Sequence, residues 1–107
     1  MPTPTPFQWP ININPNPTAP PRIKFDPNPL TNVRIGDEIF WINNDTEAHW
    51  PGRLNNDGSI DKTFFMANPI APGTSSDPFS PGVAGELKYA CSLSGHEKET
   101  GSIQVTK

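Results

Sequence analysis

The chain has 107 residues, including fifteen prolines and eight glycines, and its formal net charge is −3. This length suits a single domain with one hydrophobic core. Proline interrupts helical hydrogen-bond ladders, so the composition favours short strands joined by loops over long helices. The basic residues are scattered along the sequence rather than clustered, so we expect no nucleic-acid partner.

The first 21 residues differ from the rest, because they hold eight of the fifteen prolines. Such a segment favours extended or polyproline conformation. We therefore divide the chain into a Pro-rich N-terminal extension over 1–21 and a folded domain over 22–107. The alternating apolar side chains of Phe7, Trp9 and Ile11 leave open an edge strand within the extension.

Membrane and secretion signals are not expected from this sequence. No stretch approaches the roughly 20 apolar residues that span a bilayer. Met1 is followed by a Pro/Thr run with no positively charged n-region and no apolar h-region, so no signal peptide is predicted. The single cysteine, Cys91, excludes an intramolecular disulfide.

After the extension, apolar and polar residues alternate in most short runs between turn residues, the pattern of half-buried β-strands. Residues 38–43 are instead a nearly continuous apolar run, as expected for a strand in the core. Strands are expected over residues 22–26, 32–35, 38–43, 86–91 and 102–106. A further short strand is expected near 75–80, and residues 60–66 fit either a strand or an irregular segment. Seven or eight short strands predict an all-β fold, an antiparallel Greek-key sandwich or barrel.

The residues with the clearest chemistry are one cysteine and two histidines. Cys91 ends a predicted strand, and His96 follows it across a Gly-containing loop. His49 follows the predicted strand 38–43 after an Asn/Asp-rich turn. A trigonal site of two histidines and one cysteine suits copper electron transfer. Taken singly, His49 also fits a loop histidine bonded to a carbonyl, and Cys91 also fits a buried strand cysteine.

Three segments in order carry a resemblance to a known family. They are Gly36–Asn43 with His49, Phe79–Gly85 with Tyr89–Cys91, and Cys91–His96 with Gly101–Val105. The first fits the pattern G-D-x-[VI]-x-W-x-N followed by H, and the last fits C, then H, then G-x-[IVL]-x-[VL]. On these motifs the chain, from about Pro21 to Lys107, resembles the plastocyanin/azurin family of cupredoxins.

The resemblance implies a cupredoxin-like sandwich that binds one copper ion through His49, Cys91 and His96 in a type 1-like site. It implies a one-electron carrier rather than an enzyme, acting as a monomer in the periplasm or outside the cell. A redox partner protein would make transient contact near His96.

Two positions depart from the family pattern. The family places a weak axial methionine near the glycine that opens the last strand, where this chain has Glu99 followed by Thr100. The axial position is then filled by the Glu99 carboxylate, by water or by nothing. A carboxylate would lower the reduction potential, because it favours Cu(II). Trp50 follows His49 where well-known members carry the asparagine that braces the cysteine loop.

Other functions fit the same residues. Cys91 and His96 could form a nucleophilic thiolate–imidazolium pair, although an activated cysteine commonly lies in a positive field such as a helix N-terminus. A structural Zn²⁺ site could use the two histidines, Cys91 and Glu99. A copper-binding, storage or sensing module without an electron-transfer role is the main alternative.

Overall fold

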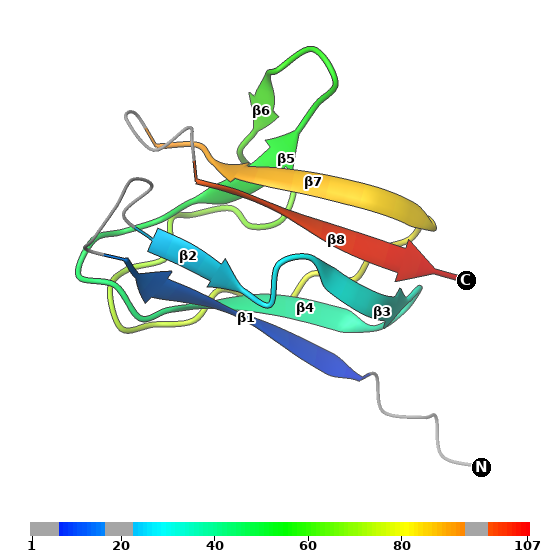
Figure 1. The fold of residues 1–107 in the computed structure, drawn as a ribbon, viewed down its shortest axis with the longest axis horizontal. Coiled ribbons are helices and arrows are strands. Elements are labelled where there is room, and N and C mark those ends of the chain that lie inside the picture. Colours follow the sequence, from blue (N-terminus) through cyan, green and yellow to red (C-terminus); the bar gives the residue numbers. More distant parts are fainter. Residues whose placement is uncertain (1–6, 17–22, 94–98) are drawn as a thin grey trace.

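The computed structural model describes residues 7–16, 23–93 and 99–107. Its regular elements are eight strands: β1 (Gln8–Pro15), β2 (Ile23–Asp26), β3 (Leu30–Arg34), β4 (Glu38–Asn43), β5 (Pro51–Leu54), β6 (Ile60–Asp61), β7 (Gly85–Cys91) and β8 (Thr100–Thr106). They form two sheets packed face to face (Figure 1). The predicted all-β sandwich is confirmed. The described residues contain no helix that is long and apolar enough to span a bilayer.

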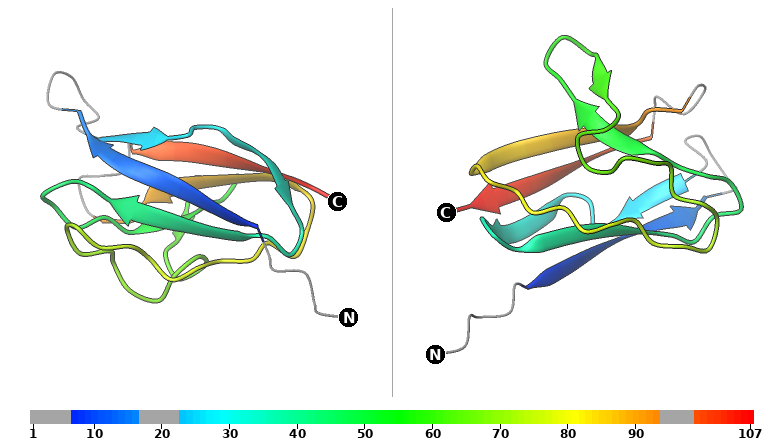
Figure 2. Two further views of the ribbon diagram at one scale, coloured as in Figure 1. Left: turned by 90° about the horizontal axis from the view of Figure 1, so that it is seen from below. Right: turned by 180° about the vertical axis from the view of Figure 1, so that it is seen from behind.

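The smaller sheet has the strand order β2-β1-β4, and the larger has the order β3-β8-β7-β5-β6. Most neighbours are antiparallel, but β1 runs parallel to β4 and β3 runs parallel to β8. Both sheets are therefore mixed rather than wholly antiparallel. Two further views show the two layers and the β5–β6 hairpin projecting from the body of the sandwich (Figure 2).

Strand β1 comes from the Pro-rich N-terminal segment. It lies between β2 and β4, so it is an internal strand and not the edge strand that the alternation allowed. Ile11 and Ile13 are fully buried, which explains why this segment joins the sheet. Pro10 is accommodated because β2 pairs only from Asn12 onward, leaving β4 as the one partner at that point. The predicted boundary at residues 21 and 22 lies outside the described residues.

The carboxylate of Asp37, in the turn before β4, accepts two hydrogen bonds, one of them from β1. The indole Nε1 of Trp9 donates to Oδ2 of Asp37 at 3.0 Å, and the backbone N–H of Arg34 donates to the same oxygen at 2.9 Å. These bonds hold the pKa of Asp37 below its ordinary value of 3.8, and the bond from Trp9 has the largest effect. The folded state therefore binds this proton less tightly than the unfolded chain does.

Asp37 is expected to stabilise the fold in a pH-dependent way. Its contribution should be present above the unfolded pKa and lost as the pH falls through the lower native pKa. Urea unfolding of the wild type and Asp37→Asn should show a stability difference at neutral pH that shrinks in acid. Trp9→Phe, which removes the indole donor, should weaken this pH dependence. An equal difference between wild type and Asp37→Asn at both pH values would contradict the assignment.

The predicted and observed strands agree best for β4, β7 and β8. Strand β4 matches its predicted range, while β7 and β8 each begin slightly earlier than expected. Strand β5 was not predicted, because it opens with Pro51-Gly52, a pair typical of turns. Gly52 is needed there, since a Cβ would lie 2.7 Å from the backbone oxygen of Asp61 in β6.

The segment between β6 and β7 follows the free edge of β4. The predicted strand over 75–80 is reduced to isolated bridges, Ile42 with Ser75 and Ile39 with Phe79. Ile39 and Phe79 exchange two backbone hydrogen bonds of 2.8 Å. Of residues 60–66, only Ile60–Asp61 forms a strand. The irregular segment thus satisfies backbone groups that would otherwise be exposed at the edge of the sheet.

Aromatic rings fill the space between the two sheets. Tyr89 of β7 packs edge-on against Phe25 and Trp41, with ring centroids 4.9 and 5.4 Å apart. Phe65 packs against Trp41 with ring centroids 5.0 Å apart and the rings tilted by 56°. Tyr89 and Trp41 are fully buried. The Tyr89 ring lies across Gly101 so closely that a Cβ there would be 2.3 Å from the ring.

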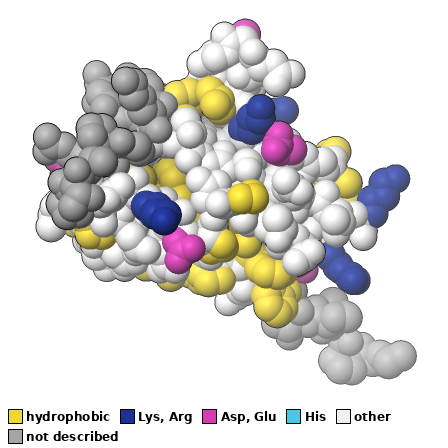
Figure 3. Space-filling view, in the orientation of Figure 1, with side chains coloured by type: hydrophobic (Ala, Val, Ile, Leu, Met, Phe, Trp, Pro, Cys, Tyr) yellow, Lys and Arg dark blue, Asp and Glu magenta, His cyan; other side chains and the backbone are white. Residues whose placement is uncertain are grey.

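Charged side chains are dispersed on the surface. The face shown in Figure 3 carries lysine, arginine and acidic side chains singly among neutral ones, with hydrophobic side chains in several separate patches. Within the described part of the chain, the large apolar side chains that are most exposed are Phe7, Ile35 and Val83. This distribution agrees with the scattered basic residues of the sequence.

Candidate metal centre

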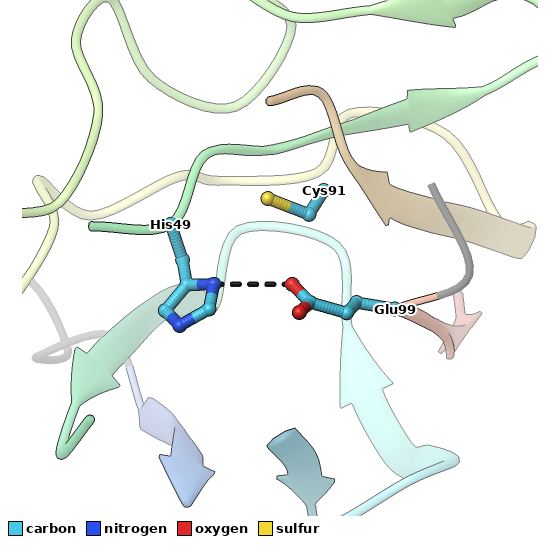
Figure 4. A group of neighbouring side chains, drawn as sticks. All are labelled: His49, Cys91 and Glu99. Atoms are coloured by element: carbon cyan, nitrogen blue, oxygen red, sulfur yellow. Dashed lines mark hydrogen bonds and ion pairs between the residues drawn. The ribbon is translucent and has the colours of Figure 1, made fainter. Parts of the chain in front are cut away.

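Three metal-ligating side chains meet at one end of the larger sheet. The donor atoms of His49, Cys91 and Glu99 lie within 4.8 Å of one another. His49 and Cys91 are fully buried, and Glu99 is 7% exposed. Figure 4 shows the His49 ring facing the Glu99 carboxylate, with Cys91 beside both. A thiol, an imidazole and a carboxylate that are buried side by side form a candidate metal site.

Neighbouring strands of the sheet bring these side chains together. Cys91 is the last residue of β7, and Glu99 directly precedes β8. The backbone N–H of Cys91 donates to the Glu99 carbonyl at 2.9 Å. His49 precedes β5, and Pro51 of β5 pairs with Cys91. The ladder of one sheet therefore spaces Cys91 and Glu99, and it brings the start of β5 beside Cys91.

A second set of bonds fixes the backbone at His49. Its N–H donates to the Ile70 carbonyl at 3.2 Å, and the Ile70 N–H donates to the His49 carbonyl at 2.7 Å. The buried amide of Asn43 donates to the same Ile70 carbonyl at 3.0 Å and to the Glu47 carbonyl at 2.8 Å. The end of β4, the following loop and the segment at Ile70 are thereby held as one unit.

The cysteine loop is braced by the backbone of Trp50. Its N–H donates to Sγ of Cys91 at 3.3 Å. Its carbonyl accepts from Ser92 twice, from the backbone N–H at 2.8 Å and from Oγ at 2.9 Å. These backbone contacts supply a brace that the sequence did not reveal. The asparagine whose side chain would brace the loop is replaced by Trp50 in this chain. The indole Nε1 of Trp50 donates elsewhere, to the Met66 carbonyl at 3.4 Å.

The His49 ring lies between two carboxylates. Nδ1 is 3.1 Å from Oε1 of Glu99, and Nε2 is 2.8 Å from Oδ2 of Asp45. Burial alone lowers the pKa of His49, but hydrogen bonds to Cys91, Glu99 and Asp45 outweigh it and raise the pKa to about 10. A metal ion on Nδ1 would replace a proton there, as metal binding to histidine requires.

The structure brings together His49, Cys91 and Glu99 from the predicted set, while His96 lies outside the described residues. Thr100, the other axial candidate, is exposed. Met66 is 6% exposed and belongs to the hydrophobic core.

Sequence reasoning missed Asp45, which contacts the far side of the His49 ring. Its only signal in the sequence is an acidic residue four positions before a histidine in a polar turn.

The donor set suits a first-row transition metal. A thiolate and an imidazole favour copper or zinc, and a carboxylate completes a set that either metal accepts. Nδ1 of His49 faces the side on which Cys91 and Glu99 lie, while its other nitrogen is engaged by Asp45. The residues present therefore fit the copper ion that the sequence resemblance implies.

No protein-family model and no curated protein sequence matches the chain. Solved structures do. A purple cupredoxin from Nitrosopumilus maritimus superposes with a TM-score of 0.76 at 21% identity, over 92% of this chain and 99% of that one. Amicyanin from Paracoccus versutus superposes with a TM-score of 0.67 at 16% identity, over 92% of this chain and 81% of that one. The reduced Cu(I) form of an amicyanin variant at pH 4 gives 0.68 at 18% identity, over 92% and 82%. The chain therefore has the cupredoxin fold.

Proposed function

We propose that this protein is a one-electron carrier with one type 1-like copper ion per chain. The observation that carries the proposal is the buried cluster of His49, Cys91 and Glu99 donor atoms within 4.8 Å of one another on a cupredoxin fold. In this proposal His49, Cys91 and His96 are the strong ligands. Copper, when bound, supplies reversible one-electron chemistry between Cu(I) and Cu(II).

The chain's own residues would keep the geometry similar in both oxidation states. His49 is held by backbone bonds to Ile70, and Cys91 by the ladder of β7 and by the Trp50 N–H. Ligands that cannot move change little between the two states, which keeps the reorganisation energy of electron transfer small. Burial of His49 and Cys91 also limits the access of water. Transfer would occur by transient contact of a partner protein near His96.

We propose Glu99 as the axial ligand. Its side chain is nearly buried, its carboxylate reaches the same space as Nδ1 of His49, and its backbone is tied to Cys91. A hard, anionic oxygen ligand favours Cu(II), so the reduction potential should be lower than with a thioether ligand. The adjacent Thr100 is exposed and is a poorer candidate.

Optical and EPR spectra of the Cu(II)-loaded protein test this function. The wild type should take up one copper ion and develop intense thiolate-to-copper absorption. Glu99→Gln should shift this absorption and the EPR parameters and raise the reduction potential, because the anionic oxygen is lost. Glu86→Gln removes the same charge from the exposed side of β7 and should leave the spectra unchanged.

Three results would contradict parts of the proposal. A colourless product from folded, reduced wild-type protein with Cu(II) would exclude the redox copper site and favour zinc or a non-metal role. Spectra identical for wild type and Glu99→Gln would remove Glu99 from the coordination sphere while leaving the carrier function intact. Alkylation of Cys91 in the copper-loaded protein would support an exposed nucleophile instead.

The same resemblance carries the remaining parts of the proposal: a monomer that works in the periplasm or outside the cell. A storage or sensing module would share the copper site but not the rapid redox reaction. Electron self-exchange, measured by NMR line broadening in mixtures of Cu(I) and Cu(II) protein, distinguishes them. A carrier should exchange electrons rapidly, whereas a storage site has no need to.

A further inference from the structure

Asp45 lies against the side of the His49 ring that faces away from Cys91. Its Oδ2 is 2.8 Å from Nε2 of His49, and its side chain is 12% exposed. We infer that Asp45 is a positioning residue, which fixes the tautomer and orientation of His49 and stabilises Cu(II) relative to Cu(I). This inference rests on the proposed copper function and extends it to a residue outside the proposed ligand set.

The tautomer argument follows from the two nitrogens of one ring. A neutral imidazole has one N–H donor and one lone pair. A carboxylate accepts hydrogen bonds and cannot donate one, so Oδ2 of Asp45 requires the proton on Nε2 of His49. When a metal ion replaces the other proton of the ring, it therefore binds Nδ1, the nitrogen that lies 3.1 Å from Oε1 of Glu99. Without Asp45, the proton on Nε2 of His49 would lose the carboxylate that holds it in place.

The position of Asp45 is itself fixed by a buried side chain. Its backbone N–H donates to Oδ1 of Asn43 at 2.9 Å. Asn43 is fully buried, and its Nδ2 donates to the Ile70 carbonyl that also accepts the His49 N–H. Asp45 and His49 are thus anchored through the same two residues, Asn43 and Ile70. The carboxylate and the ring meet in a prearranged position rather than by chance contact.

The charge of Asp45 should distinguish the two oxidation states. A carboxylate that accepts a hydrogen bond from a metal-bound imidazole makes that imidazole a stronger donor. The extra electron density and the negative charge favour the ion of higher charge, and partial burial preserves the effect against screening by water. Removing this charge should therefore weaken Cu(II) binding more than Cu(I) binding.

The test compares Asp45→Asn with Glu47→Gln in the full chain. Asparagine retains the shape and one acceptor oxygen but loses the charge, and Glu47→Gln removes the same charge from an exposed side chain of the same loop. Competition titrations with Cu(II) and with Cu(I) measure the two affinities separately. Asp45→Asn should lower Cu(II) affinity about 10–100-fold and Cu(I) affinity less. A tenfold difference between the two corresponds to a potential raised by about 59 mV. Glu47→Gln should change the two affinities nearly equally or not at all.

A second readout needs no variant. Heteronuclear NMR of the diamagnetic Cu(I)-loaded wild type should show His49 protonated at Nε2, with the slowed proton exchange of a hydrogen bond to a carboxylate. Asp45→Asn should accelerate that exchange. Nδ1 protonation in the loaded wild type would overturn the inference even if the variant failed to fold.

The remaining outcomes separate this inference from the function on which it rests. Equal changes for Asp45→Asn and Glu47→Gln would show a general charge effect and overturn the positioning role. A wild type that forms no coloured Cu(II) complex would refute the carrier function. In that case the Zn(II)-loaded protein supplies the same tautomer measurement, and Nε2 protonation there would still support the role of Asp45.

Discussion

Replacing Cys91 with serine is expected to abolish the intense visible absorption of the copper-loaded protein. The absorption requires a thiolate bonded to Cu(II), and Cys91 is the only cysteine in the chain. Serine has nearly the same size but binds copper as a neutral, weakly coordinating hydroxyl. Optical titration with Cu(II) should therefore show a colourless or faintly coloured product, and Cu(I) affinity should fall most, because Cu(I) prefers soft sulfur ligands.

The neighbouring Ser92 supplies the matched control. Ser92→Ala removes the Oγ bond to the Trp50 carbonyl but keeps the thiolate, so the absorption should persist with a small shift. Circular dichroism should show that both variants remain folded, since Cys91→Ser changes little volume in the core. Retention of the intense band in Cys91→Ser would mean that the chromophore does not involve this sulfur.

Gly101→Ala is expected to destabilise the fold strongly although it adds only one methyl group. The new Cβ would lie 2.3 Å from the Cζ and Oη atoms of Tyr89. That ring is fully buried and packs edge-on against Phe25 and Trp41, so a shift of the ring would disturb both of these contacts. Overpacking of this kind costs on the order of 1–3 kcal/mol or more. Urea unfolding of the metal-free protein should show the loss directly.

Two comparisons make this prediction specific. Gly82 has open space around its Cα, so Gly82→Ala should be neutral or slightly stabilising. In a Tyr89→Leu background the phenol ring is absent, and Gly101→Ala should cost much less than in the wild type. A cost that is the same in both backgrounds would show that the Tyr89 ring is not the obstacle.

Strands β7 and β8 could be predicted because burial on one face produces regular alternation, and β4 because a nearly continuous apolar run fits a strand in the core. Strand β4 was predicted with its bounds, and the all-β sandwich followed from strand number and spacing. Two elements could not be predicted for physical reasons. Strand β5 begins with Pro51-Gly52, a turn-type pair whose glycine is set by the close approach of Asp61 in another strand. Strand β1 owes its internal place to two non-local partners, β2 and β4.

The residues of the candidate metal centre could be named where motifs carry chemistry, but not where contacts join distant segments. His49, Cys91 and Glu99 were named from their motifs and spacing, and the structure brings them together. Asp45 was missed because an acidic residue in a polar turn has no distinctive pattern. The brace between Trp50 and Ser92 uses backbone groups, which every sequence contains, so its location depends on the fold.

The ladder that joins β5, β7 and β8 has a consequence for how such a centre tolerates change. Pro51 pairs with Cys91, and Ala90 pairs with Thr100, so the spacing of Cys91 and Glu99 is a matter of strand register. A slip of one residue would turn Cys91 or Glu99 to the opposite face of the sheet. His49 lies outside this ladder, because its backbone is bound to Ile70, whose carbonyl also accepts from Asn43 of the smaller sheet. Substitutions that alter the distance between the two sheets would therefore move His49 relative to the other two donors while leaving their register intact.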